Sequence, residues 1–150
     1  MKISIITINY NDKEGLKKTI LSVINQINVS FEYIIIDGGS NDGSIDVINK
    51  FRKHFSYYVS EPDQGIYNAM NKGIRKAKGE YLLFLNGGDL LIENENILSN
   101  CCKYLKEDIV SFNCYLEKEG EIVGIRRHIE FPTLFYIYKN GLIKVIYLKK

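Results

Sequence analysis

The sequence predicts a single α/β domain built on a mostly parallel β-sheet with covering helices. Segments of strand character and segments with helical apolar spacing alternate along the chain as far as residue 89, an order typical of a parallel sheet. The apolar run 82–85 has the length and residue types of a fully buried strand. With 150 residues, 45% of them hydrophobic, the chain is long enough to enclose one core.

Each expected element follows from apolar spacing and from the residues that interrupt it. Strands are expected at 3–8, 33–36, 57–59 and 82–85. Helical spacing after the first three strands predicts helices over 15–26, 45–51 and 66–77. Gly79 is a natural stop for the last of these. Beyond residue 89 the pattern predicts a helix over 97–105 and two strands, 109–116 and 122–125, around a polar turn at 117–120.

Polar residues follow all four of the first strands at the point where each strand ends. They are amides, carboxylates and glycines, in the segments 9–11, 37–40, 61–63 and 86–89. In an open α/β sheet, ligands bind in the crevice beyond the carboxyl ends of the strands. Small residues allow a close approach there, and carboxylates can hold a ribose hydroxyl or a hard cation. The same residue types dominate ordinary turns, but their coincidence at four places on one edge favours a ligand site.

Three stretches of the chain resemble the family 2 glycosyltransferases of the GT-A fold, which are bacterial nucleotide-sugar-dependent enzymes. The stretches SIITINYND, IIIDGGSNDGS and SEPDQGIYNAMNKGIRKAKGEYLLFLNGGD follow the family's order and together cover residues 3–89. The versions D-G-G-S, S-E-P-D-x-G-I-Y and L-N-x-G-D resemble a subgroup from polysaccharide and colanic-acid-type biosynthesis. The resemblance implies a Rossmann-like three-layer sandwich, with a nucleotide-sugar-binding core over 1–130 and a remnant of the acceptor-side segment over 131–150.

The resemblance, together with the loop residues, also indicates the nucleotide-sugar contacts. Asp37 is expected to bond to the nucleoside, with UDP as the expected nucleotide, and Asp63 to add a second polar contact. The second acid of the family's D-D-G-S element often contacts the base, and Gly38 stands at that position here. For Lys72 a solvated surface lysine is the favoured alternative. The full set of expected contacts is Thr7, Asn9, Tyr10, Asn11, Asp37, Gly38, Asp63, Asn71 and Lys72.

The resemblance implies a divalent cation, Mn²⁺ or Mg²⁺, at the loop after the fourth strand. The family's loop reads D-x-D, whereas Asn86 and Gly88 replace the two aspartates here, so that Asp89 is the carboxylate that is left. Asp89 and Asn86 are therefore the expected metal ligands, and binding is expected to depend on oxygens supplied by the diphosphate of the donor. The cation would neutralise the diphosphate and stabilise the leaving group.

The resemblance places a catalytic base on a later, acceptor-binding segment, and the sequence identifies no residue for this role. The candidate acids are Glu107, Asp108, Glu117, Glu119, Glu121 and Glu130. Most of them are expected in a solvated turn or in structural positions. The chain is therefore expected to be a donor-binding half without its acceptor half, which binds donor but transfers sugar slowly.

The implied activity is an inverting, metal-assisted transfer of a sugar from a nucleotide-sugar, expected to be a UDP-sugar, to a saccharide or lipid-linked acceptor in cell-surface polysaccharide synthesis. One alternative is a catalytically weak or dead nucleotide-binding remnant of such an enzyme. A sugar-nucleotidyltransferase is disfavoured because ITINYNDKEG contains no phosphate loop rich in Gly, Arg and Lys. The apolar, basic tail is the basis for a further alternative, a module that binds a membrane surface. The favoured interpretation of the tail is a helix packed on the domain.

Composition narrows the partners and the location. The net charge of +2, from 20 basic and 18 acidic side chains, argues against nucleic acid. Cys101, Cys102 and Cys114 lack C-x-x-C spacing and are expected to be reduced thiols of a cytosolic protein. The first residues lack the shape of a signal peptide, and no apolar stretch reaches the roughly 20 residues of a spanning helix. A cytoplasmic location is expected, with peripheral association at the inner face of the membrane as the possibility that the tail raises.

Overall fold

The computed structural model describes residues 3–91, 96–102, 105, 109–111, 114–118, 121–126 and 144–147. The strands are β1 (Ile3–Asn9), β2 (Phe31–Asp37), β3 (Tyr57–Ser60), β4 (Tyr81–Asn86), β5 (Ile109–Ser111), β6 (Cys114–Lys118), β7 (Glu121–Arg126) and β8 (Lys144–Tyr147). The helices are α1 (Lys13–Ile24), α2 (Ser44–Phe51), α3 (Ile66–Lys76), α4 (Ile97–Cys101) and the 3-10 helix η1 (Arg52–His54).

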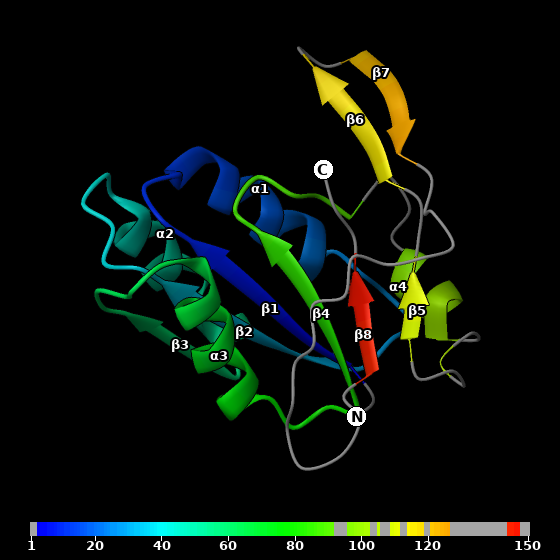
Figure 1. The fold of residues 1–150 in the computed structure, drawn as a ribbon, viewed down its shortest axis with the longest axis horizontal. Helices are drawn as coiled ribbons and strands as arrows, with labels where there is room; N and C mark the ends of the chain where they lie inside the picture. The colour runs from blue at the N-terminus through cyan, green and yellow to red at the C-terminus, as the bar shows by residue number, and fades with distance from the viewer. Residues whose placement is uncertain are drawn as a thin grey trace.

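Six of these strands form one parallel sheet in the order β3-β2-β1-β4-β8-β5 (Figure 1). The central strand β1 pairs with β2 on one side and with β4 on the other. The chain therefore adds β2 and β3 on one side of β1 and then crosses over to add β4 on the other side. The register sets Asn9 level with Asp37 and Ile8 level with Asn86. The carboxyl ends of β1, β2 and β4 therefore lie side by side, as the sequence predicts.

Helices cover both faces of the sheet. Side chains at odd positions of β1, β2 and β4 pack against α1, α2 and α4, whereas those at even positions pack against α3 (Figure 1). Both sets are buried, which explains why these strands are almost continuously apolar. The prediction of a three-layer α/β sandwich on a mostly parallel sheet is confirmed.

The helices begin and pack where local sequence allows it. Asp12 caps α1, because its Oδ1 accepts the backbone N–H of Gly15 at 2.9 Å. Leu16, Ile20 and Val23 then recur on one face of the helix and are fully buried. Helix α3 packs closely on β1 at Gly73, because a Cβ on this glycine would lie 2.5 Å from Cγ2 of Ile6.

Three expectations for the second half of the chain are wrong in detail. The single strand expected over 109–116 is divided between β5, in the main sheet, and β6, which forms an antiparallel pair with β7 apart from that sheet (Figure 1). The helix expected over 97–105 is shorter, since α4 ends at Cys101. Part of the tail forms a strand in place of the favoured helix.

That strand is β8, which lies between β4 and β5 and pairs in parallel with both. Its sequence, KVIY, combines two β-branched residues and an aromatic one, which suits a strand better than a helix. The acceptor-side remnant is expected to begin at residue 131, and residues 131–143 lie outside the described residues.

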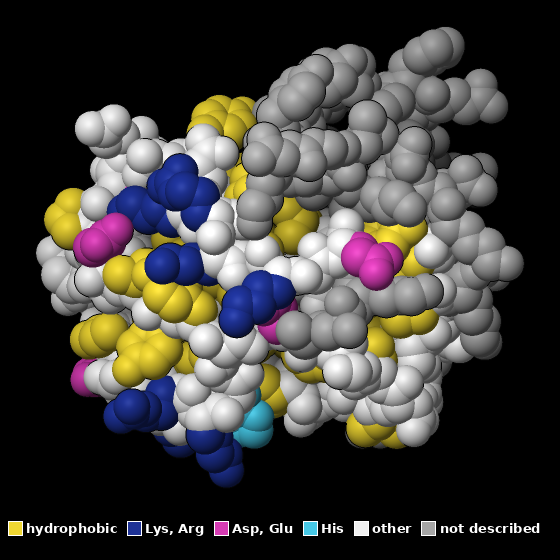
Figure 2. Space-filling model, turned by 90° about the horizontal axis from the view of Figure 1, so that it is seen from below, with side chains coloured by type: hydrophobic (Ala, Val, Ile, Leu, Met, Phe, Trp, Pro, Cys, Tyr) yellow, Lys and Arg dark blue, Asp and Glu magenta, His cyan; other side chains and the backbone are white. Residues whose placement is uncertain are grey.

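The surface shows mixed character. On the face drawn in Figure 2, Lys and Arg side chains lie in small separate groups between hydrophobic and acidic ones. Within the described ranges, none of the helices is long and apolar enough to cross a membrane. Burial raises the pKa of the Cys101 thiol to about 11, so that this thiol stays protonated at neutral pH.

Candidate functional site

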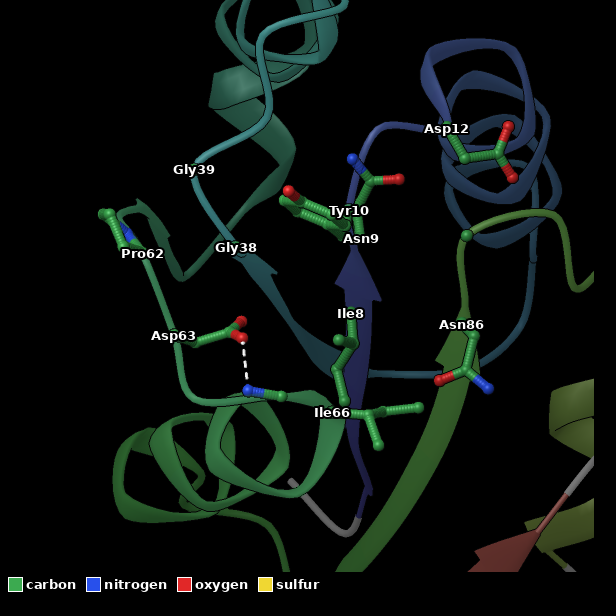
Figure 3. A pocket seen from close by; sticks show the side chains of 12 residues that line it. Ile8, Asn9, Tyr10, Asp12, Gly38, Gly39, Pro62, Asp63, Ile66 and Asn86 are labelled. Atoms are coloured by element: carbon green, nitrogen blue, oxygen red, sulfur yellow. Dashed lines mark hydrogen bonds between the residues drawn. The ribbon is translucent and has the colours of Figure 1, made fainter.

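A pocket of about 690 Å³ lies beyond the carboxyl ends of β1, β2 and β4 (Figure 3). This volume is within the range of small-molecule sites. Gly38, Gly39, Pro62 and Asp63 stand on one side of it and Asn86 on the other, with Ile66 at the start of α3 between them. The complete lining is Ile8, Asn9, Tyr10, Asp12, Gly38, Gly39, Pro62, Asp63, Gly65, Ile66, Asn86 and Gly87.

Asp37 lies beneath this pocket and holds the loops around it together. Its side chain is fully buried. One carboxylate oxygen accepts hydrogen bonds from Asn9 Nδ2 at 2.8 Å and Ser40 Oγ at 2.6 Å, and the other accepts from Ser60 Oγ at 2.6 Å and Ser40 N at 2.9 Å. Burial alone would raise the pKa of Asp37, but the hydrogen bonds from Ser40, Ser60 and Asn9 outweigh it and hold the pKa below its ordinary value.

Asn9 connects the buried network to the pocket. Its Nδ2 also donates to Ser40 Oγ at 3.3 Å and to Ser44 Oγ at 3.0 Å. These donor bonds fix the orientation of the amide, and its Oδ1 accepts no hydrogen bond from the described part of the chain. A Cβ on Gly87 would lie 2.7 Å from this oxygen, so the glycine leaves the amide room under the loop after β4.

Tyr10 supplies an exposed aromatic surface at the mouth of the pocket. The side chain is 68% exposed, so that most of the ring is accessible to a ligand. Its ring stands beside Gly38 (Figure 3), and its Cδ2 lies 3.2 Å from the position of a Cβ on that glycine. An exposed ring at the edge of a polar pocket is suited to stacking against a flat ligand.

Asp63 brings a carboxylate to the same side of the pocket. Its Oδ1 accepts the backbone N–H of Gly65 at 2.9 Å (Figure 3). Gly65 has φ 101° and ψ 173°, a conformation that is open almost only to glycine, and it precedes the first turn of α3. The backbone N–H groups at the start of the helix present partial positive charge at the pocket edge. The first turn contains no acidic side chain that would neutralise this charge.

Lys72 supports the loop that carries Asp63. Its Nζ lies 2.9 Å from Oε1 of Glu61 and donates to the carbonyl oxygen of Pro62 at 3.1 Å. The side chain is only 17% exposed. The favoured description of Lys72 as a solvated lysine is therefore wrong, because the ammonium group ties α3 to the loop before it.

The loop after β4 presents an amide to the pocket rather than a carboxylate. Asn86 lines the pocket, and its buried Oδ1 accepts no hydrogen bond from the residues that the structure describes. Asp89 is only 6% exposed, and its Oδ2 accepts the backbone N–H of Asn86 at 3.1 Å. Among the described residues, no three His, Cys, Asp or Glu side chains gather to hold a metal ion. One neutral oxygen fits a cation only if a ligand supplies most of the other oxygens.

The structure brings some of the expected site residues together and separates others. Asn9, Tyr10, Gly38, Asp63 and Asn86 line one pocket. The other expected residues, Thr7, Asn11, Asp37, Asn71, Lys72 and Asp89, are not among the lining residues.

The residues outside the lining have contacts of their own. Thr7 is fully buried, and its Oγ1 lies 3.0 Å from the hydroxyl of Tyr33. Asn11 joins two loops, since its backbone N–H donates to Ser40 Oγ at 2.8 Å and its Oδ1 accepts from Asn41 N at 2.9 Å. Asn71 is exposed on α3. These side chains support the walls of the pocket or lie outside it.

Sequence reasoning missed several lining residues. Asp12 was recognisable as a helix cap, because it stands three residues before Gly15 at the start of an apolar periodic segment. Ile8 and Ile66 carried no chemical signal, whereas Gly39 and Gly87 lie in the segments 37–40 and 86–89 that were expected to border a ligand site. Among the acids considered as catalytic base, Glu117 lies in β6 and Glu121 in β7, whereas Glu107, Asp108, Glu119 and Glu130 lie outside the described residues.

A family model decides the relationship of this chain to known proteins. The model described as glycosyl transferase family 2 matches residues 4–147. The chain belongs to glycosyl transferase family 2. This confirms the family prediction, and the match extends from the second residue of β1 to the last residue of β8, the first and last strands described.

Curated members of family 2 share substantial identity with this chain. An uncharacterized glycosyltransferase of Mycobacterium tuberculosis is 44% identical over 88 residues, or 58% of this chain. An uncharacterized glycosyltransferase of Haemophilus influenzae is 38% identical over 141 residues, and a cholesterol galactosyltransferase of Borreliella burgdorferi is 31% identical over 135 residues; each match covers 88% of this chain. The chain spans 34%, 56% and 38% of the lengths of these three relatives, respectively.

Solved structures of glycosyltransferases share the fold. S. aureus TarS 1-349, in complex with UDP-GlcNAc, superposes on 85% of this chain and 37% of its own, with a TM-score of 0.69 and 20% identity. The mannosyltransferase PcManGT of Pyrobaculum calidifontis, in complex with GDP-Man and Mn²⁺, superposes on 79% of this chain and 36% of its own, with a TM-score of 0.65 and 20% identity. At this identity the likeness shows the GT-A fold.

Proposed function

We propose that this chain binds a nucleotide-sugar, with a UDP-sugar as donor, and takes part in transferring the sugar to a saccharide or lipid-linked acceptor. The observation that carries the proposal is the pocket beyond β1, β2 and β4, in which the exposed ring of Tyr10 and the carboxylate of Asp63 face the amide of Asn86. Family membership supports glycosyl transfer as the reaction. The cholesterol galactosyltransferase among the relatives supports an acceptor of lipid character.

The parts of a nucleotide-sugar match the sides of the pocket. A base can stack on Tyr10 beside Gly38, where the wall has no side chain. A diphosphate between Ile66 and Asn86 would face the N–H groups at the start of α3, where the helix dipole favours negative charge. The sugar would then project past Asn86 towards solvent. TarS in complex with UDP-GlcNAc supports a donor of this class.

A divalent cation fits this arrangement when the diphosphate completes its coordination. The Oδ1 of Asn86 is the oxygen that this chain would contribute, since it faces the pocket and accepts no hydrogen bond within the described residues. When bound, Mn²⁺ or Mg²⁺ would neutralise charge on the departing diphosphate. PcManGT in complex with GDP-Man and Mn²⁺ supports this part of the proposal.

The reaction itself would be a displacement at the anomeric carbon, with inversion as in the family that the sequence resembles. The chain's described residues would bind the nucleotide, orient the diphosphate and hold the loops. Asp37 does the last of these, through its bonds to Asn9, Ser40 and Ser60. Fixing the donor in this way lowers the entropic part of the barrier before any acceptor arrives.

A turnover assay tests the proposal. The purified chain is incubated with UDP-glucose, UDP-galactose, UDP-GlcNAc or GDP-mannose, Mn²⁺, and a lipid or oligosaccharide acceptor extract, and released nucleoside diphosphate is measured. We expect release of UDP from at least one UDP-sugar, and its loss in Tyr10→Ala. Binding of UDP without release from any donor would favour the alternative of a non-catalytic nucleotide-binding remnant. Absence of both binding and release would overturn the proposal.

A further inference from the structure

Gly38 and Asp63 share one small volume at the base of the pocket wall. A Cβ added to Gly38 would lie 2.8 Å from Oδ2 and 3.3 Å from Cγ of Asp63. The backbone of Gly38 does not have the positive φ that requires a glycine. A side chain at position 38 would therefore displace the carboxylate of Asp63, which comes from the loop after β3 and lies beside Gly38.

The carboxylate of Asp63 is held firmly in this place. Its Oδ1 accepts the N–H of Gly65 at 2.9 Å. Lys72 holds the loop that carries Asp63, through its bonds to Glu61 and Pro62. The same loop lies close to Gly39, where an added Cβ would lie 3.1 Å from the nitrogen of Pro62. Oδ2 is left towards Gly38 and the ring of Tyr10.

We infer that Asp63 reads the nucleobase and selects uracil. This rests on the proposed function, because it assigns a role within the nucleotide pocket. A base stacked on Tyr10 would present its edge to Oδ2 of Asp63, which can accept one hydrogen bond from a ring N–H. Uracil offers a single such donor at N3. Guanine offers two adjacent donors, which a carboxylate matches with both oxygens, and here Oδ1 is occupied by Gly65.

Cytosine provides the closest comparison. It has the same ring size as uracil and stacks on an aromatic side chain in the same way, but its N3 is an acceptor, which would face the lone pairs of Oδ2. The carboxylate should therefore reject cytosine. An asparagine at position 63 would keep an oxygen for Gly65 N and turn an NH₂ group towards the base, which reverses the hydrogen-bond pattern.

Calorimetric titrations of UDP and CDP in the presence of Mn²⁺ test this inference. Wild type should bind UDP at least about 10-fold more tightly than CDP, as expected for a charge-assisted hydrogen bond gained with one base and lost with the other. Asp63→Asn should lower the affinity for UDP by a similar factor and raise the affinity for CDP. The two affinities should then lie within about 3-fold of each other, or their order should be reversed. Asp46→Asn, on α2 outside the pocket, makes the same change of charge and should leave the ratio as in wild type.

A second variant addresses the shared volume directly. Gly38→Ala places a methyl group 2.8 Å from the present position of Oδ2, so the carboxylate must shift. The variant should therefore reduce UDP affinity on its own and cause little further loss when combined with Asp63→Asn. The inference is wrong if Asp63→Asn keeps the UDP-to-CDP ratio of wild type while still binding UDP. If wild type binds neither nucleotide, the proposed function fails and this inference with it. The wild-type comparison of UDP with CDP requires no mutation, so it remains informative if a variant does not fold.

Discussion

Asn9 and Asp37 meet at the carboxyl ends of neighbouring strands, with Nδ2 of the asparagine 2.8 Å from Oδ1 of the aspartate. The two residues are paired in the register of β1 and β2. Each then connects to a different part of the site, Asn9 to the pocket lining and Asp37 to Ser40 and Ser60 in the loops beyond. The geometry of the pocket therefore depends on a buried polar pair, of which Asn9 lines the pocket and Asp37 does not.

Replacing Asp37 tests this dependence through pH. Because its folded-state pKa is lowered, the ionised carboxylate contributes stability above the ordinary aspartate pKa of about 4 and loses that contribution as the pH falls further. We expect Asp37→Asn to lower the free energy of unfolding by about 2–3 kcal/mol at pH 7. Urea unfolding at pH 7 and at pH 3 should show a smaller difference between variant and wild type at pH 3. An equal difference at both values would mean that Asp37 is not the titrating group.

Gly65 and Gly73 lie at the start and in the middle of the α3 segment and are required for different reasons. Gly65 is needed for its backbone conformation, with φ 101° and ψ 173°, and not for space, since an added Cβ would meet nothing within 4 Å. Gly65→Ala should lower the free energy of unfolding by about 1–3 kcal/mol through strain. Gly73→Ala should cost a similar amount through overpacking against Ile6.

Double mutants separate the two causes. Ile6→Ala should offset part of the cost of Gly73→Ala, because it removes the methyl group that the new Cβ would meet, and it should not offset that of Gly65→Ala. Denaturant unfolding of the singles and both doubles provides the comparison. Equal coupling in the two pairs would contradict the assignment of strain to Gly65.

Lys72→Met tests the support of the loop that carries Asp63. The ion pair of Lys72 with Glu61 is partly exposed and therefore contributes little to stability. We expect the free energy of unfolding to change by less than about 1 kcal/mol. The loop should loosen, and the affinity for UDP should fall by about 3- to 10-fold, or about 0.7–1.4 kcal/mol. Arg75→Met, exposed on the same helix, is the control. An unchanged affinity in Lys72→Met would show that the loop holds its position without the lysine.

The loop after β4 can be tested with Mn²⁺. Since the pocket receives from this loop one amide oxygen, Mn²⁺ should bind weakly to the free chain and at least about 10-fold more tightly when UDP is present. Asn86→Ala should remove most of this gain. Asp89→Asn should affect thermal stability more than the gain, because Asp89 accepts the backbone N–H of Asn86 beneath the pocket. Tight Mn²⁺ binding without UDP would show that ligands beyond Asn86 complete the site.

The sequence was sufficient to locate the pocket and insufficient to say which residues line it. The four polar strand ends follow from the alternation of strands and helices, and the structure brings Asn9, Tyr10, Gly38, Asp63 and Asn86 together from all four. Thr7 could have been recognised as buried, since it is two residues from Ile5 on the strand face that packs against α1.

Other features depend on contacts between distant segments. The carboxylate of Asp63 fills the space beside Gly38 because β2 and β3 are paired in one register, with Asp37 level with Ser60. No local pattern predicts this. The same holds for β8, which is separated by more than 50 residues from its partner β4. Its β-branched and aromatic residues favour a strand over a helix, but no local pattern indicates that this strand pairs with β4.

Titration of UDP into the purified chain, with Mn²⁺ present, tests the central claim most directly. The account predicts one saturable site per chain and a loss of affinity in Tyr10→Ala of about 1–3 kcal/mol, the contribution of one base stacked on an aromatic ring. Tyr58→Ala, in β3 away from the pocket lining, serves as the control for removal of a tyrosine and should retain binding if the chain stays folded. If UDP shows no saturable binding, or binds Tyr10→Ala as tightly as wild type, the pocket is not the nucleotide site described above.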